Sequence, residues 1–197
     1  MKIRNKLSLY FAYAFAHILL ISCQRENLES ILEDKPTAGE TATGKSSLTG
    51  VDAPIADGIY RISVTSTGKP MDVRGSSQAE GAVIQQSQWD GGGAQKWQVT
   101  HLGDGNYKIT NVGSGKVVSV EGASLADGAR IVQYTWNGSL HQQWWINHVG
   151  AGRYYLVNRA SGKVINVSGD AGWDGAELIQ WPPSGGSNDK WYFDKLQ

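Results

Sequence analysis

The sequence contains a single cysteine, Cys23, among its 197 residues. No disulfide can therefore form within the chain, and the residues after Cys23 offer no thiol for nucleophilic catalysis. Charged residues are also scarce, at 18%, and the 18 Lys and Arg are balanced by 18 Asp and Glu. Without an excess of positive charge the sequence lacks the electrostatic signature of nucleic-acid binding, so we expect no nucleic acid among its partners.

Sequence patterns of known catalytic sites are missing as well. There is no His-Glu-x-x-His and no nucleophile elbow, and Gly91-Gly92-Gly93 lacks the Lys-Ser/Thr continuation of a phosphate-binding loop. Glycoside hydrolysis requires two carboxylates across one cleft, whereas many acids of this chain stand at expected turns. We therefore expect a protein that is not an enzyme and that uses no cofactor and no metal ion.

The one long apolar run lies at the N-terminus. Three basic residues precede an apolar stretch from Leu7 to Ile21, which has the proportions of a signal peptide rather than a membrane span. The following Leu20-Ile21-Ser22-Cys23 resembles the bacterial lipobox, which implies cleavage before Cys23 and attachment of lipid to it. We expect residues 1–22 to be a lipoprotein signal peptide; an ordinary signal peptide with a chance cysteine is the alternative.

Residues 23–56 are expected to form the lipidated cysteine and a flexible tether. Lys35 to Leu48 combines proline and glycine with a run of Thr and Ser, and it has too little apolar surface to offset the entropy of ordering. Loss of residues 1–22 removes three basic residues and no acid, which leaves a net charge of about −3. The expected location is that of an exported, membrane-anchored lipoprotein, at the outer membrane or cell surface.

The remaining residues repeat themselves at an interval of 47 residues. Trp97, Trp144 and Trp191 are spaced by this interval, and the preceding glutamines Gln86, Gln133 and Gln180 follow the same spacing. The interval defines three repeats, which cover residues 57–103, 104–150 and 151–197. Each unit of such an array normally buries its apolar face against its neighbours.

Each repeat is expected to contain four short strands separated by glycine-containing turns. In the first repeat these are Tyr60–Val64, Pro70–Val73, Ala82–Gln86 and Trp97–Val99. No apolar period of 3.6 residues is present in this part of the chain, so helices should be few. Three units are too few for a typical propeller, and their similarity leaves no distinct caps for an open solenoid. The fold class is therefore all-β, a β-trefoil closed about a pseudo-threefold axis with the three tryptophans in its core.

The three Gln-x-Trp-type units, each preceded by a Gly-Ala-x-(Ile/Leu)-x-Gln strand, resemble the ricin B-type lectin domain over residues 57–197. The resemblance implies a carbohydrate-binding β-trefoil with one shallow sugar pocket for each repeat. An aspartate of the second strand and an asparagine before the Gln-x-Trp glutamine would bond adjacent sugar hydroxyls, beside a third-strand glutamine. An aromatic ring would stack on the sugar's C–H face. The Gln-x-Trp glutamine would support the pocket from behind.

The resemblance assigns candidate site residues to each repeat, and no repeat matches the pattern fully. The first pocket has Asp72, Gln86, Trp89 and Gln95, with Ala94 at the asparagine position. The second has Gln133, Trp136, His141 and Gln142, with Ser119 in place of the aspartate. The third has Asn166, Gln180, Trp181 and Asn188, with Asp189 in place of the supporting glutamine. We rank the first and third pockets above the second.

Several of these assignments have structural alternatives. The third-strand glutamines have a second interpretation, in which they satisfy buried backbone groups. Trp89 and Trp136 fall on expected loops beside glycines, which favours stacking on a ligand. Trp173 is either a surface platform or a packing lid. The lysines beside turn glycines, Lys69, Lys116 and Lys163, are expected to be solvated.

The function that follows is that of a lipid-anchored lectin, which recognises glycans through shallow, multivalent sites. Galactose- and xylose-type sugars are the candidate ligands, the membrane is a partner through the lipid anchor, and neighbouring surface proteins that process glycans are candidate protein partners. The alternative is a structural or protein-binding β-trefoil without sugar activity.

Overall fold

The computed structural model describes residues 54–197, and it consists of twelve strands and five single-turn 3-10 helices. The signal peptide, Cys23 and most of the tether lie outside the described residues. The first repeat contains β1 (Gly58–Val64), β2 (Met71–Val73), η1 (Arg74–Ser76), β3 (Ile84–Gln86), η2 (Gly93–Gln95) and β4 (Trp97–His101). The second contains β5 (Asn106–Asn111), β6 (Val117–Val120), η3 (Glu121–Ala123), β7 (Ile131–Tyr134), η4 (Leu140–Gln142) and β8 (Trp144–His148). The third contains β9 (Tyr154–Asn158), β10 (Val164–Val167), η5 (Ser168–Asp170), β11 (Leu178–Trp181) and β12 (Trp191–Lys195).

This inventory confirms the all-β, threefold prediction. Each expected strand of the first repeat is present, with ends shifted by at most two residues. No helix in residues 54–197 is long and apolar enough to cross a membrane.

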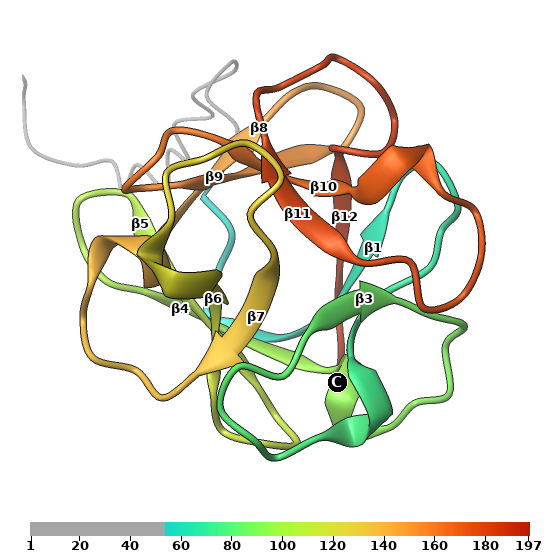
Figure 1. Ribbon diagram of the computed structural model, residues 1–197, viewed down its shortest axis with the longest axis horizontal. Helices are drawn as coiled ribbons and strands as arrows, with labels where there is room; N and C mark the ends of the chain where they lie inside the picture. Colours follow the sequence, from blue (N-terminus) through green and yellow to red (C-terminus); the bar gives the residue numbers. More distant parts are fainter. Residues whose placement is uncertain (1–53) are drawn as a thin grey trace, which may run out of the picture. The chain divides into compact units, whose positions relative to one another are not determined.

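Six strands close into a barrel, because each pairs antiparallel with two others in the order β1, β4, β5, β8, β9, β12 and back to β1. The other six form three hairpins, β2–β3, β6–β7 and β10–β11, which we call the cap hairpins. Single bridges join these hairpins to one another, at Val83–Val132, Gln85–Glu177 and Arg130–Ile179. Strands β3, β7 and β11 accordingly surround the centre of the view in Figure 1.

The three repeat tryptophans join the barrel to the caps. Trp97, Trp144 and Trp191 have no exposed surface. The indole Nε1 of each donates a hydrogen bond to a carbonyl in the second strand of its own repeat, 26 residues earlier. The acceptors are Met71 O at 3.0 Å, Val118 O at 3.1 Å and Ile165 O at 3.0 Å. A buried indole needs such a partner for its N–H, so this one residue both fills the core and fixes a cap hairpin.

The third-strand glutamines join each repeat to the one before it. Gln133 has no exposed surface, and its Nε2 donates to Ser77 O at 2.8 Å and Ala79 O at 3.1 Å. Its Oε1 accepts from Ser114 Oγ at 2.6 Å. The equivalent bonds recur in the other two repeats, where Gln86 holds Ala171 O and Trp173 O, and Gln180 holds Ser124 O and Ala126 O. Of the two interpretations considered for these residues, the structure shows the structural one.

The turn lysines also link neighbouring repeats, and the expectation that they are solvated was wrong. Their side chains are about four-fifths covered, and each pairs with the acid of the preceding repeat's acid-glycine turn. The pairs are Lys69–Asp174 at 2.7 Å, Lys116–Glu80 at 3.4 Å and Lys163–Asp127 at 3.3 Å. The acids keep about half of their surface exposed, so each pair contributes at most about 1 kcal/mol and mainly sets the position of the turn.

Replacement of a core tryptophan tests this role. We expect Trp144→Ala to lower the free energy of unfolding by about 3–5 kcal/mol, because it leaves a cavity and removes the donor to Val118 O. Trp181→Ala, at a partly exposed tryptophan, is the matched control and should change it by less than about 1 kcal/mol. Urea unfolding measures both values, and equal losses in the two variants would contradict the assignment of Trp144 to the core.

Candidate functional site

The outer face of the third cap hairpin gathers three of the predicted site residues. The register of β10 and β11 pairs Asn166 with Ile179 and Val164 with Trp181. Because side chains alternate along a strand, Asn166 and Trp181 lie on the same face as diagonal neighbours, about 7–8 Å apart at their backbones. Asn188, which precedes β12, donates its Nδ2 to Asn166 Oδ1 at 3.1 Å. Trp181 is 43% exposed, so an aromatic surface stands beside two amides.

Asp189 supports this pocket only in part. In the first two repeats, the equivalent glutamines donate to one loop carbonyl and accept from one loop N–H; these are Gln95 and Gln142. Asp189 Oδ2 accepts from Ser184 N and Ser184 Oγ, both at 2.8 Å. Its buried Oδ1 has no hydrogen-bond partner among residues 54–197. A carboxylate cannot donate a hydrogen bond. Asp189 therefore accepts from the loop as the equivalent glutamines do, but it lacks the hydrogen bond that they donate to a loop carbonyl.

The first pocket is built around Asp72, which is 7% exposed. Its Oδ1 accepts from Gln85 Nε2 at 2.9 Å, and Gln85 Oε1 in turn accepts from Arg74 Nε at 2.8 Å. Burial raises the pKa of the Asp72 carboxyl, while side-chain hydrogen bonds from Gln85 and Gln95 lower it in part. Gln85, the hydrogen-bond partner of Asp72, was not singled out from the sequence. Its position could have been found from the sequence, because side chains alternate along the strand Ala82–Gln86. Since residues 84 and 86 face the core, residue 85 faces outward.

The second pocket is the least polar of the three. Ser119 is fully buried, and its Oγ has no hydrogen-bond partner within the described part of the chain. His141 is half-buried, and burial lowers the pKa of its imidazole, which favours the neutral ring. This arrangement offers a sugar no charged acceptor.

The candidate aromatic platforms occupy two positions that are not equivalent in the repeat. Trp89 and Trp136 are half-buried, and each carries a cation over its ring, Arg61 Cζ at 5.5 Å and Lys108 Nζ at 5.6 Å from the ring centroid. Trp181 belongs to a different position, whose equivalents are Tyr134 and Ser87, at the end of the cap hairpin. Since a cation covers one face of Trp89 and of Trp136, Trp181 is the better placed platform.

The fully buried glutamines Gln86, Gln133 and Gln180 do not contribute to these outer surfaces, because their amides are engaged between repeats. Within residues 54–197 no group of three or more His, Cys, Asp or Glu is placed to hold a metal ion.

The sequence repeats and the threefold fold both correspond to one protein family. The family described as ricin-type β-trefoil lectin domain-like matches residues 50–134, 93–181 and 140–197. The chain belongs to this family. A search of curated protein sequences found no match.

Solved structures with the same fold include both a designed protein and natural ones. The designed threefold-symmetric protein ThreeFoil is 41% identical with a TM-score of 0.70, over 71% of this chain and all of that one. An exo-β-1,3-galactanase from Clostridium thermocellum is 34% identical with a TM-score of 0.69, over 71% of this chain but only 30% of the galactanase. The Macrolepiota procera ricin B-like lectin, solved with lactose, is 20% identical with a TM-score of 0.61, over 75% of this chain and all of the lectin.

The raised pKa of Asp72 in this lectin-like domain predicts a pH-dependent stability. The folded state holds the Asp72 proton to a higher pH than the unfolded chain does, where the carboxyl has an ordinary aspartate pKa of about 4. Stability therefore falls as the pH rises from that value through the folded pKa. Asp72→Asn keeps an oxygen that can accept from Gln85 and removes the charge, so its free energy of unfolding should exceed that of the wild type at about pH 7 but not at about pH 3. Denaturant titrations at the two pH values measure this, and a gain of equal size at both would contradict it.

Proposed function

We propose that this protein binds glycans through the outer faces of its cap hairpins, and chiefly through the third. The observation that carries the proposal is the exposed ring of Trp181 on the same face as Asn166, whose amide is bonded to that of Asn188. An indole ring covers the C–H face of a pyranose, and neighbouring amides satisfy its adjacent hydroxyls. The first pocket is the second candidate site, because Asp72 supplies a buried carboxylate there.

Proteins with the same fold support carbohydrate as the ligand class. The Macrolepiota procera lectin was solved with lactose and the earthworm R-type lectin C-half with GalNAc. The galactanase acts on β-1,3-galactan by its description. Galactose-type sugars are therefore the first ligands to test, with xylose-type sugars as the second group.

Binding at each pocket is expected to be weak. A shallow site with one aromatic face and a few amides corresponds to about −4 to −5 kcal/mol, or dissociation constants from the high micromolar to the millimolar range. Engagement of two pockets by one glycan surface raises the avidity through effective concentration.

A protein-binding or structural role is the second candidate function. The observation that favours it is the use of Asp72 inside the protein, where Gln85 and Arg74 occupy the polar groups that a sugar would need. Absence of binding across a broad glycan array, together with co-purification of a defined protein, would favour this candidate.

Removal of the pocket amide and carboxylate tests the sites. We expect Asn188→Ala and Asp72→Ala each to lower retention on immobilised galactose-type glycans, because each variant loses a polar contact to sugar hydroxyls. Asn147→Ala, at an exposed asparagine of barrel strand β8, is the matched control and should bind like the wild type. Unchanged retention in the double variant, with an unchanged circular dichroism spectrum, would show that these residues are not the sites.

We further propose that the protein is held at a membrane by lipid on Cys23, outside the inner membrane. The support is the sequence Leu20-Ile21-Ser22-Cys23 after the N-terminal apolar run. Acyl chains contribute about 0.8 kcal/mol for each buried CH₂, so two or more chains on one residue give stable anchoring.

A cysteine substitution tests the anchor. In cells that process lipoproteins, Cys23→Ser should abolish labelling of the protein with radioactive palmitate, because the residue that carries the lipid is lost. Ser22→Ala keeps a small residue before the cysteine and should remain lipidated. A Cys23→Ser protein that still incorporates palmitate would contradict the proposal.

A further inference from the structure

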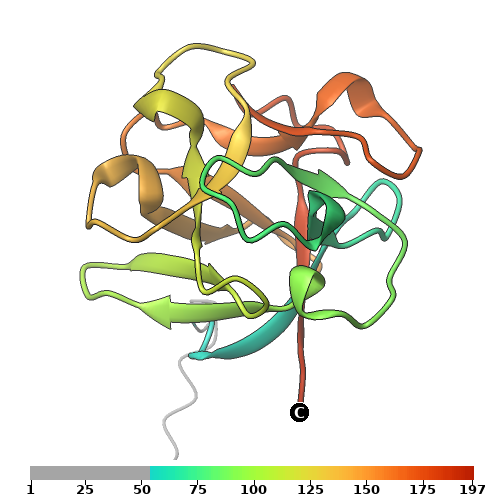
Figure 2. The same cartoon turned by 60° about the horizontal axis from the view of Figure 1, so that its bottom comes forward.

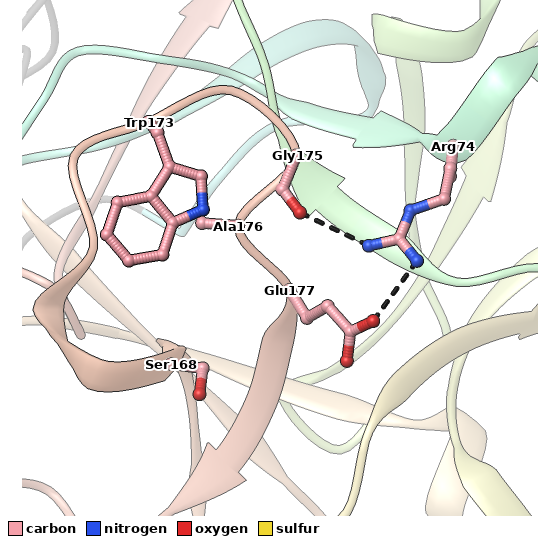
Figure 3. A pocket seen from close by; sticks show the side chains of 6 residues that line it. All are labelled: Arg74, Ser168, Trp173, Gly175, Ala176 and Glu177. Carbon is pink, nitrogen blue, oxygen red and sulfur yellow. Dashed lines mark hydrogen bonds and ion pairs between the residues drawn. The ribbon is translucent and has the colours of Figure 1, made fainter.

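A surface pocket lies between the first and third repeats, beside the sites described above. Its volume is about 310 Å³, and its lining residues are Arg74, Ser168, Trp173, Gly175, Ala176 and Glu177. Figure 3 shows the indole of Trp173 with Ala176 beside it on one side, Arg74 and Glu177 on the other, and Ser168 below the indole. Trp173 is 68% exposed, although it is the largest apolar side chain of its loop.

The threefold repeat supplies an internal comparison for this tryptophan. The positions equivalent to Trp173 hold Ala79 and Ala126, so the fold itself requires no large side chain there. The loop is nevertheless fixed in place, because Trp173 O accepts from Gln86 Nε2 at 3.1 Å and Gly172 O accepts from Lys69 Nζ at 2.8 Å. An exposed ring on an anchored backbone is a preorganised surface for a ligand.

The same comparison explains why a pocket is present at this seam, the boundary between the first and third repeats. At the other two seams an aromatic ring lies against the turn glycine of the preceding repeat: a Cβ on Gly81 would be 3.1 Å from Tyr134 Oη, and one on Gly128 would be 3.7 Å from Trp181 Cζ3. The first repeat has Ser87 at the aromatic position. The space beside Gly175 is therefore not filled by a ring from the first repeat.

The polar side of the pocket is suited to neutral hydroxyl groups. Arg74 uses three of the five N–H groups of its guanidinium, to Gln85 Oε1, Glu177 Oε1 and Gly175 O. Glu177 accepts with Oε1, and its Oε2 takes part in no hydrogen bond within residues 54–197. Two adjacent hydroxyls can accept from the remaining arginine N–H groups and donate to that oxygen. Because the Arg74–Glu177 ion pair at 3.1 Å is neutral in sum, an acidic sugar gains no net attraction here.

This pocket continues the face that carries the third-repeat site. Ser168 N donates to Glu177 O at 3.0 Å, which extends the ladder that pairs Asn166 with Ile179. This hydrogen bond places Ser168 opposite Glu177, just beyond the ends of β10 and β11 and two residues along from the Asn166–Ile179 pair, about 7 Å away. Trp181 and Trp173 therefore stand toward opposite ends of one polar strip.

We propose that the pocket between Trp173 and the Arg74–Glu177 pair is a second saccharide subsite, which takes a further ring of a neutral oligosaccharide whose first ring is held at Trp181. This subsite rests on the proposed glycan-binding function and adds to it a preference for chains over single sugars. Trp173 stacks on the ring, while Glu177 and Arg74 bond to its hydroxyls.

The test uses the ¹H–¹⁵N indole signals of the full-length protein, assigned with Trp→Phe variants. The probes are galactose, xylose and a β-linked trisaccharide of each. We expect a monosaccharide to shift the Trp181 signal and not the Trp173 signal. The matching trisaccharide should shift both Trp181 and Trp173 and bind about tenfold more tightly.

Variants separate the subsite from the first site. Trp173→Ala introduces the residue found at both equivalent positions, so the fold should be kept; it should remove the trisaccharide preference and leave monosaccharide affinity unchanged. Trp173→Phe should retain part of the preference, and Glu177→Gln should reduce it. Leu125→Ala, at another exposed apolar residue of a cap loop, is the matched control and should change neither affinity.

The outcomes distinguish the two proposals. A trisaccharide that shifts Trp181 alone, or a preference that survives Trp173→Ala, would overturn the second subsite and leave the proposed function standing. If none of the four sugars shifts any indole signal, those of Trp89 and Trp136 included, at about 10 mM, well above the expected dissociation constants, the glycan-binding function fails and the subsite fails with it.

Discussion

The hydrogen bond from each repeat tryptophan to a second-strand carbonyl is the interaction on which the rest of the domain depends. It is made by a side chain with no exposed surface, and it links a barrel strand to a cap hairpin in every repeat. Once the caps are fixed, the buried glutamines can reach the loops of the preceding repeat and close the ring of three. The outer faces of the cap hairpins therefore rest on a backbone arrangement that is nearly the same in all three repeats.

The sequence predicted this frame well, because a residue needed by the fold recurs at every repeat. The 47-residue spacing of Trp97 and its equivalents was sufficient for the fold class and for the strand positions. The direction of single side chains was harder to predict. Gln85 and Gln86 are adjacent, and only the phase of β3 decides that Gln85 meets Asp72 while Gln86 enters the space between repeats. The lysine partners were missed because they lie in another repeat, which the local sequence does not reveal.

The site residues were less predictable than the fold because the outer faces differ among the three repeats. The positions of Trp97 and Gln86 are the same in every copy, whereas that of Asp72 holds an acid, a hydroxyl and an amide in turn. Residues that no packing requirement fixes can vary independently, so one pattern cannot describe all three pockets. Burial raises the pKa of the Asp72 carboxyl, which disfavours its ionised form, and shifts of this kind are enriched at functional sites.

The pairing of the first and last barrel strands has a consequence for how the domain can be fused to other proteins or immobilised. β1 and β12 run antiparallel side by side, with Tyr60 opposite Lys195, so the chain enters and leaves at one end of the barrel. Figure 2 shows this end, with the C-terminus, pointing away from the cap loops. A fluorescent protein, a resin linker or a second copy joined after Gln197 would leave the caps unobstructed, which makes the domain a suitable module for arrays of chosen valency.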